Sequence, residues 1–281
     1  MSVLIFLDQS EGSIKRNSLE AVSYGVKVAE MTGTDAEGIV LGNIKDDLAL
    51  LGEYGLKRIH AFKNDELNTL DAQVFTNIIA EAAMRTGATV IIFSNNINGK
   101  AIAPRLSVKL KAGLVSGAVA LPEITNGFIV KKNVFSGKAF ANVQIKTEVK
   151  IISLNPNSYK ITKTNGTAEV IEPDISIPQP KITVTAVNKI AGEVPLSEAS
   201  LVISGGRGLK GADNWYLVTD LAKALGAATA CSRAVADAHW RPHHEHVGQT
   251  GLAIAPDLYF AIGISGAIQH LAGVNRSKVI V

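Results

Sequence analysis

Short apolar runs alternate with amphipathic segments through the first half of the chain, and this alternation leaves few folds open. The apolar runs lie at Ser2–Leu7, Gly38–Leu41, Lys57–Phe62 and Ala88–Phe93. Between them, apolar residues recur with a helical period. Short apolar runs joined by helices are typical of parallel strands that are buried on both faces. The pattern predicts an α/β fold whose N-terminal domain is built on a doubly wound, mostly parallel sheet.

Local signals predict where the helices begin and end. Asn17 and Glu20 have the spacing of a capping box, and Gly33 follows the last apolar position of that helix. In the helix predicted at Lys100–Lys111, Pro104 is expected near the first turn, because proline is tolerated there.

The alternation of apolar runs and helical segments ends after about residue 113. The next strand-like segments are separated by turn residues, and they lie at Ala118–Leu121, Phe128–Lys132, Ala139–Lys146 and Lys150–Leu154. These segments are expected to extend the sheet with antiparallel strands. Residues 155–187 are rich in Pro, Thr and Asn, and Pro173, Pro178 and Pro180 favour an extended linker in the later part.

A second strand–helix–strand pattern begins near Glu198. Its predicted strands are Ser200–Ser204, Ala227–Cys231, Leu258–Gly263 and Lys278–Val281. Its main helix, Asp213–Leu225, has one apolar side formed by Leu217, Leu221, Ala222 and Leu225. The sequence therefore predicts two domains, as expected for this length. Residues 1–187 are expected to form an N-terminal α/β domain with an antiparallel extension and a linker, and residues 188–281 a second α/β domain with a parallel sheet.

Charge, cysteine content and the length of apolar stretches limit the kinds of partner and location to expect. A formal net charge of +3 over 281 residues gives no reason to expect a nucleic-acid partner. The single cysteine, Cys231, excludes an internal disulfide and suits a reducing compartment. The N-terminus lacks the cationic region of a signal peptide, and no apolar stretch has the length of a membrane span. We expect a cytoplasmic protein without membrane insertion.

The first candidate binding segment is the glycine-rich turn at residues 204–210, Ser-Gly-Gly-Arg-Gly-Leu-Lys. It follows a strand and precedes a helix. Its glycines allow the backbone to approach a phosphate, and Arg207 can add a charge-assisted hydrogen bond. The spacing is neither that of a Walker A loop nor that of a dinucleotide-binding fingerprint, so a turn without a ligand is an equal alternative.

Two later loops have similar features. In His246–Gly251, glycines flank polar side chains, and the loop can direct the Thr250 hydroxyl and backbone amides at a flat ring. In Gly263–His270, Ser265 is expected to cap a short helix, on which Gly266 and His270 would share a face. The alternatives are an ordinary surface turn for the first loop and a structural histidine for the second.

A fourth segment, Ser232-Arg233, also follows a strand. Ligands of open α/β sheets bind at the carboxyl ends of the strands, so the four segments favour one shared site. Cys231 is expected to be a small buried residue and not a nucleophile. For the histidines at 239, 243, 244 and 246, a solvated loop is favoured over a metal site, because their spacing matches no common zinc site.

Together these motifs resemble the alpha subunits of electron transfer flavoproteins. The segments that carry the resemblance are Ser204–Gly208, Ser232-Arg233, Val247–Gly251 and Gly263–Gly273, with weaker similarity at Ala103–Leu106 and Ser136–Ala139. The resemblance implies an electron carrier without substrate turnover of its own, which holds FAD in its second domain. It also implies a heterodimer with a beta subunit that binds AMP. The implied electron donors are flavin dehydrogenases, such as the acyl-CoA dehydrogenases of fatty acid oxidation, and the implied acceptor is a quinone reductase.

The resemblance further implies roles for individual residues in binding FAD. Arg207 would lie near the phosphates or the ring edge, and Arg233 would lie over the isoalloxazine ring. Thr250 would form a hydrogen bond near N5 of the flavin, and His270 would lie near the pyrimidine carbonyl. The other residues implied to bind FAD are Ser232, Val247, Gly248, Gln249, Ser265, Gly266, Ala267, Ile268 and Gln269.

The family pattern continues past Val281 with an Asn and an Asp that help to hold the adenosine half of FAD, so the resemblance implies an FAD-binding domain that is incomplete at its C-terminus here. An alternative is a nucleotide-binding or regulatory module of the same fold without redox activity. A flavin enzyme with its own substrate ranks last, because no acid–base pair lies near the motifs. The motifs leave open whether the carrier takes part in electron bifurcation.

Overall fold

The computed structural model describes residues 2–174, 177–186 and 195–281, which form two compact units. The first unit comprises Met1–Asn133 and Phe140–Val187, and the second comprises Val134–Ala139 and Asn188–Val281. The predicted domain boundary after residue 187 lies outside the described residues. Within the described ranges, no helix combines the length and the apolarity that crossing a membrane requires.

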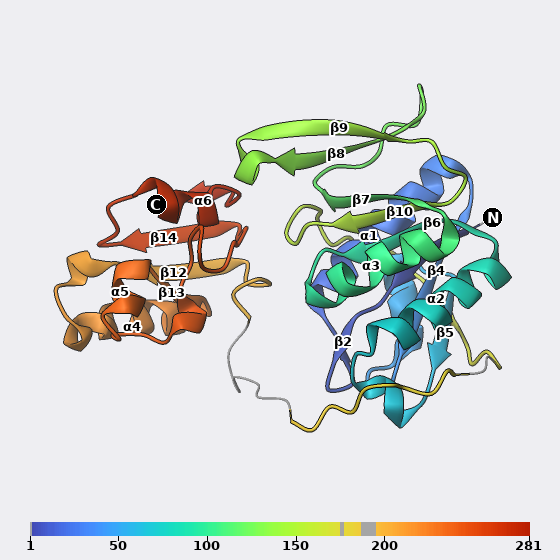
Figure 1. Cartoon of the computed structure of the whole chain (residues 1–281), viewed down its shortest axis with the longest axis horizontal. Coiled ribbons are helices and arrows are strands. Elements are labelled where there is room, and N and C mark those ends of the chain that lie inside the picture. The colour runs from blue at the N-terminus through green and yellow to red at the C-terminus, as the bar shows by residue number, and fades with distance from the viewer. Residues whose placement is uncertain (1, 175–176, 187–194) are drawn as a thin grey trace. The chain divides into compact units, whose positions relative to one another are not determined.

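The first unit is built on a nine-stranded sheet (Figure 1). In spatial order, its strands are β11 (Glu169–Ile171), β5 (Arg58–Phe62), β4 (Asp35–Leu41), β1 (Ser2–Phe6), β6 (Ala88–Ser94), β10 (Lys150–Leu154), β7 (Gly113–Ala118), β8 (Phe128–Val134) and β9 (Ala139–Ile145). The strands from β11 to β7 pair in parallel, and β8 pairs antiparallel to β7. A small antiparallel hairpin, β2 (Gln9–Ser10) and β3 (Ser13–Ile14), follows β1.

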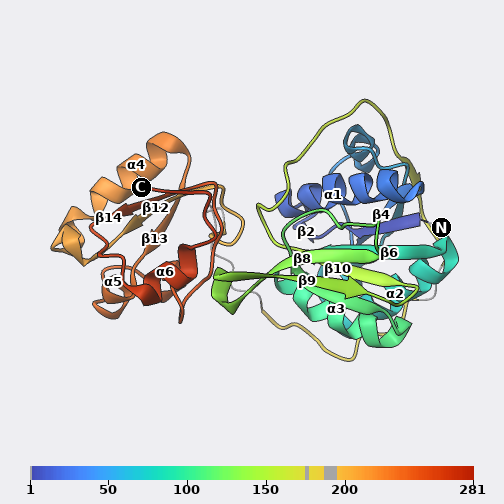
Figure 2. The same cartoon turned by 90° about the horizontal axis from the view of Figure 1, so that it is seen from above.

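Helices cover both faces of this sheet (Figure 2), as its apolar strands require. The helix α1 (Arg16–Thr32) lies on one face, while α2 (Ala72–Thr86) and α3 (Ile97–Leu110) lie on the other. Short 3₁₀ helices occur at Leu48–Tyr54, Asp65–Asn68 and Phe135–Gly137.

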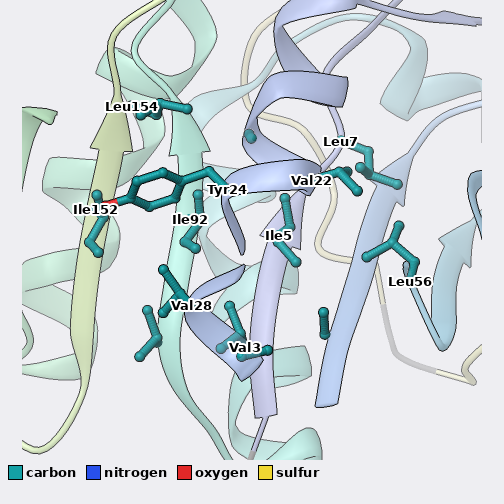
Figure 3. Close-up of a cluster of buried hydrophobic side chains, with 14 of the residues drawn as sticks. Val3, Ile5, Leu7, Val22, Tyr24, Val28, Leu56, Ile92, Ile152 and Leu154 are labelled. Atoms are coloured by element: carbon teal, nitrogen blue, oxygen red, sulfur yellow. The ribbon is translucent and has the colours of Figure 1, made fainter. Parts of the chain in front are cut away.

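The core of the first unit follows from the alternation of side chains along the strands. On β1, Val3 and Ile5 belong to the cluster under α1, and Leu4 and Phe6 belong to the cluster under α2 and α3. Figure 3 shows the α1 side, where Tyr24 extends from the helix over the sheet. The Tyr24 hydroxyl donates a hydrogen bond of 3.0 Å to the carbonyl of residue 120, and burial raises the pKa of the phenol.

The second unit is built on a smaller parallel sheet with the strand order β13 (Ala228–Cys231), β12 (Leu201–Gly205), β14 (Leu258–Ile262) and β15 (Val279–Ile280). Its helices are α4 (Tyr216–Leu225), α5 (Arg233–Asp237) and α6 (Ile268–Val274), with 3₁₀ turns at Arg207–Leu209, Ala212–Trp215 and His243–Glu245. The helices α4 and α5 pack with Ile203 of β12, whereas α6 packs with Val202 on the opposite face. Each unit therefore has its own apolar core.

The predicted fold class is confirmed, but two predicted helix starts are wrong. The helix α1 begins at Arg16 after the N-cap Lys15, so Asn17 lies inside the helix and is not its cap. The Glu20 carboxylate accepts a hydrogen bond from the backbone N–H of Asn157. The helix α3 begins at Ile97 because the Asn96 side chain accepts from the N–H of residue 99. As a result, Pro104 lies in the helix interior and not in the first turn.

The predicted antiparallel extension is only partly right. β10 pairs in parallel between β6 and β7, while β8 pairs antiparallel to β7. In the second unit, the buried residues of α4 are Val218 and Ala222, whereas Leu217 and Leu225 are about half exposed. The predicted apolar side of that helix is therefore rotated from the side that packs against β12 and β13.

Candidate functional site

A cavity of about 820 Å³ lies in the second unit, lined by the loops that follow β12, β13 and β14. This volume suits a cofactor-sized ligand, and the carboxyl ends of parallel strands are the usual place for such a site. All but two of the residues that the resemblance implies for FAD binding line the cavity, and the two exceptions are Gly266 and Ile268. The structure thus brings together all four segments singled out from the sequence.

The glycine-rich turn after β12 packs directly against the loop after β14. The N–H of Gly206 donates to the carbonyl of Ile262 at 2.8 Å, and the N–H of Gly208 donates to the carbonyl of Gly263 at 2.9 Å. A methyl group on Gly206 would lie 2.2 Å from the Gly263 oxygen. The turn therefore needs its glycines for contact between the two loops, and this contact leaves Arg207 and Gly208 in the cavity wall.

Backbone hydrogen bonds also hold the Val247–Gly251 loop. The N–H of Val247 donates to the carbonyl of Cys231 at 3.0 Å, and the N–H of Gln249 donates to the carbonyl of Gln269 at 2.7 Å. The loop is thereby tied to β13 on one side and to α6 on the other. A rigid support of this kind positions Gly248, Gln249 and Thr250 along the cavity.

The start of α6 differs from the sequence prediction. The helix begins at Ile268, and its N-cap is Ala267 without a side-chain hydrogen bond, so Ser265 is not the cap. Gly266 has a left-handed φ of 72° and precedes the helix, so it does not share a helical face with His270. The turn at Gly266 places Ser265 and Ala267 in the cavity wall. As in any helix, the backbone N–H groups of the first turn lack intrahelical partners, and such groups favour an anion.

The charged groups of the wall are Arg207, Arg233 and Asp237. The Nε atom of Arg233 lies 3.2 Å from a carboxylate oxygen of Asp237, one helical turn away on α5. More than half of each side chain is exposed, and exposed ion pairs of this type stabilise a fold by only about 0–1 kcal/mol. The pair is therefore free to exchange partners with an anionic ligand, and the positive charge is in excess.

His270 is held firmly in the wall. Its Nε2 atom lies 2.7 Å from the hydroxyl oxygen of Tyr259 on β14, and its side chain is buried. Burial lowers the pKa of the imidazole, and positive charge on His246 would lower it further. Burial also raises the pKa of Tyr259, so the phenol keeps its proton at working pH. The hydrogen bond fixes the orientation of the imidazole relative to the sheet.

Cys231 and the histidine-rich segment have other surroundings. Cys231 is fully buried, and burial raises the pKa of its thiol to about 12, so the thiol stays protonated and does not act as a nucleophile. The rings of His239 and His243 meet edge to face at 6.3 Å. Among the residues that the structure describes, no group of three or more His, Cys, Asp or Glu side chains has a metal-binding arrangement.

Sequence reasoning did not place six residues of the cavity wall in the site, namely Gly208, Ala234, Asp237, His246, Gly263 and Ile264. Four of them, Gly208, His246, Gly263 and Ile264, lie inside the candidate segments, so their positions in these segments were a usable signal. Asp237 is four residues after Arg233 on a helix, which is the spacing of an ion pair. The sequence carries no comparable signal for Ala234.

Two comparisons with known proteins agree with this geometry. The family model described as "Electron transfer flavoprotein FAD-binding domain" matches residues 195–275, and the model described as "Electron transfer flavoprotein domain" matches residues 3–178. The chain is 32% identical to an electron transfer flavoprotein subunit alpha from Syntrophomonas wolfei, over 98% of this chain and 87% of that protein. It is also 32% identical to the same subunit from Bacillus subtilis, over 99% and 86% of the two chains, and 28% identical to "Protein FixB" from Clostridium saccharobutylicum, over 99% and 86%.

Proposed function

Since the chain belongs to the family of electron transfer flavoprotein alpha subunits, we propose that it is the FAD-holding subunit of a heterodimeric electron carrier. The observation that carries the proposal is the cavity of the second unit, where four separate segments meet at the carboxyl ends of the strands. Its chemistry suits FAD, which joins a polar flat ring to an anionic pyrophosphate.

The residues present fit both parts of this cofactor. Arg207 and the backbone amides around Ser265 and Ala267 would hold the pyrophosphate, because a helix N-terminus and an arginine both favour anions. Arg233, Thr250 and His270 would hold the ring, together with the remaining residues implied by the resemblance. Gly266 and Ile268 lie outside the cavity wall, so their part in binding is the least supported by the geometry.

FAD supplies the ring that accepts and releases electrons, and the chain sets the surroundings of that ring. Arg233 keeps its positive charge at any working pH, so it favours extra negative charge on a nearby group. The buried His270 and Tyr259 pair adds a fixed polar contact. Among the described residues that line the cavity, Asp237 is the one carboxylate, and its pairing with Arg233 supports an electron carrier over an enzyme with a substrate of its own.

Membership of the family supports a proposal for the wider assembly. The chain forms a heterodimer with a beta subunit that binds AMP, takes electrons from flavin dehydrogenases such as acyl-CoA dehydrogenases, and passes them to a quinone reductase. Residues 188–281 are the FAD-binding domain in this proposal. The cytoplasmic location expected from the sequence stays a prediction.

Electron transfer into the purified heterodimer tests this function. An acyl-CoA dehydrogenase in catalytic amount, supplied with its acyl-CoA substrate, is mixed with the heterodimer without oxygen, and flavin absorbance is followed. We expect the flavin bands to bleach and to return when a quinone reductase and a quinone are added. A heterodimer that binds adenine nucleotide but accepts no electrons would support the regulatory module instead.

A further inference from the structure

His246 lies in the cavity wall at the start of the candidate loop His246–Gly251, although the resemblance gives it no role in binding FAD. It connects the 3₁₀ turn at His243–Glu245 to the Val247–Gly251 loop, and its side chain is only 8% exposed. A methyl group on Gly251 would lie 2.8 Å from the Nδ1 atom of His246. A methyl group on Gly248 would lie 3.3 Å from its Nε2 atom. The loop therefore wraps closely around the imidazole, and its two glycines make room for the ring.

The His246 ring forms no hydrogen bond with any residue in the described ranges, although it is more than nine-tenths buried. A buried polar group without a partner costs free energy, so the ring needs a partner from the cavity that it lines. His270 already has such a partner in Tyr259. In His270 only Nε2 has this partner, whereas neither ring nitrogen of His246 has a hydrogen-bond partner in the described ranges, so His246 keeps hydrogen-bonding capacity for a ligand.

The two histidines are close enough to influence each other. A methyl group on Gly248 would contact both the Nε2 atom of His246 and, at 3.7 Å, the Cα atom of His270. Burial is the largest cause of the lowered pKa of His246, and positive charge on either histidine disfavours positive charge on the other. Both imidazoles are therefore neutral near pH 7.

Other titratable or charged groups also face His246. They are Arg233 and Asp237 of α5, His243 and Glu245 of the 3₁₀ turn, Cys231 of β13, and Arg207 across the cavity. Asp237 raises the pKa of His246, whereas Arg233 and His243 lower it. Glu245 is ion-paired with Arg241, and the Cys231 thiol stays protonated. No anion among these groups balances a proton on His246 strongly, so a ligand with negative charge has the largest effect.

We propose that His246 is a second histidine of the flavin site, which forms a hydrogen bond to the bound cofactor and takes up a proton from solvent when the anionic cofactor enters. The inference rests on the proposed function, because it assumes an anionic flavin ligand. Negative charge in the cavity stabilises the imidazolium, and repulsion allows only one histidine of the pair to gain a proton readily.

The dissociation constant of FAD as a function of pH tests this inference. Flavin is removed from the native heterodimer and titrated back between pH 5.5 and 8, with fluorescence quenching as the readout. One proton taken up on binding makes affinity rise as pH falls, by up to about tenfold per pH unit. We expect this rise in the native protein and a much flatter profile in His246→Gln. His244→Gln, an exposed position on the same turn, is the matched control and should keep the native profile.

A second measurement uses histidine signals in the NMR spectrum of the native protein. The chain has six histidines, and the signal missing in His246→Gln identifies the residue. We expect its pKa to rise when FAD binds. If His246→Gln binds FAD as tightly as the native protein does, and its affinity changes with pH in the same way, the inference is overturned and the proposed function stays in place. A native heterodimer that binds no FAD at any pH would overturn both.

Discussion

At the residue scale, the sign of the charge in the cavity depends on the Arg233 and Asp237 pair. Both side chains are more than half exposed, and both line the wall. Arginine is always charged at working pH, so the balance between the two shifts when either is neutralised. The pair is therefore the most direct means to change the electrostatic environment of a bound ring.

Arg233→Ala should lower the reduction potential of the bound flavin, because it removes positive charge that favours the reduced, more negative ring. Asp237→Asn should raise the potential, because it removes the opposing carboxylate. The expected changes are on the order of tens of millivolts, since a tenfold change in a one-electron equilibrium is about 59 mV. Spectroelectrochemical titration of the heterodimer gives both values.

Asp220→Asn is the control for this pair, because Asp220 is exposed on α4 and does not line the cavity. It should leave the potential unchanged. Shifts of the same sign in Arg233→Ala and Asp237→Asn would contradict the proposed electrostatic role.

At the element scale, α6 and the Val247–Gly251 loop approach each other closely at two glycines. A methyl group on Gly273 would lie 2.5 Å from the Cα and N atoms of Gly248. Backbone atoms cannot move aside as a flexible side chain can. The position of the loop in the cavity therefore depends on the absence of a side chain at residue 273.

Gly273→Ala should destabilise the second unit by about 1–3 kcal/mol, which is typical of overpacking, and should weaken FAD binding. Helix propensity alone predicts the opposite sign, since alanine is favoured over glycine by about 1 kcal/mol. Thermal unfolding and flavin titration measure the two effects. Gly211→Ala is the matched control, because a methyl group there meets nothing within 4 Å, and it should change neither quantity. Equal behaviour of the two variants would argue against a close approach.

A second prediction at this scale concerns β4 and β5, where a Glu37 carboxylate oxygen lies 2.7 Å from Nε2 of His60. The hydrogen bond to His60 holds the pKa of Glu37 below its ordinary value, and Arg58 adds to the effect. A lowered carboxyl pKa stabilises the folded state above the ordinary pKa of about 4.3, and this stabilisation is lost as pH falls below it.

Glu37→Gln should therefore be less stable than the native protein at pH 7, by about 1 kcal/mol or more, and should lose less stability between pH 5 and pH 3. Urea unfolding of the first unit at several pH values checks both effects. Glu66→Gln, at an exposed position, should follow the native protein. A constant difference between Glu37→Gln and the native protein across the acid range would contradict the lowered pKa.

The elements that sequence reasoning placed correctly are those with local signals. The apolar runs predicted most strands of both sheets to within a few residues, and Gly33 ends α1 as expected. They missed β11, and β7 shares only Ala118 with the predicted strand Ala118–Leu121. The insertion of β10 between β6 and β7 was missed, because it depends on pairing between residues far apart in the sequence. The start of α6 was missed because the backbone at Gly266 adopts a turn that outweighs the capping preference of Ser265. The segments that line the cavity could be singled out because glycines and polar residues after strands are visible locally, whereas the close approach of His246 to two glycines exists only in the folded chain.

At the scale of the whole molecule, each unit has an apolar core of its own, and the cavity belongs to the second unit, where residues between 207 and 270 line it. Binding of FAD by this unit and formation of the carrier assembly can therefore be measured separately. The proposed function, partners and residue roles all depend on the assignment of FAD to this cavity.

The visible absorption spectrum of the heterodimer, purified after co-expression of this chain with its beta subunit, tests that assignment most directly. We predict flavin absorption bands, with FAD released on denaturation in an amount stoichiometric with the chain, and bleaching of the bands on chemical reduction. A correctly folded but colourless heterodimer that binds adenine nucleotide and no FAD would contradict the account.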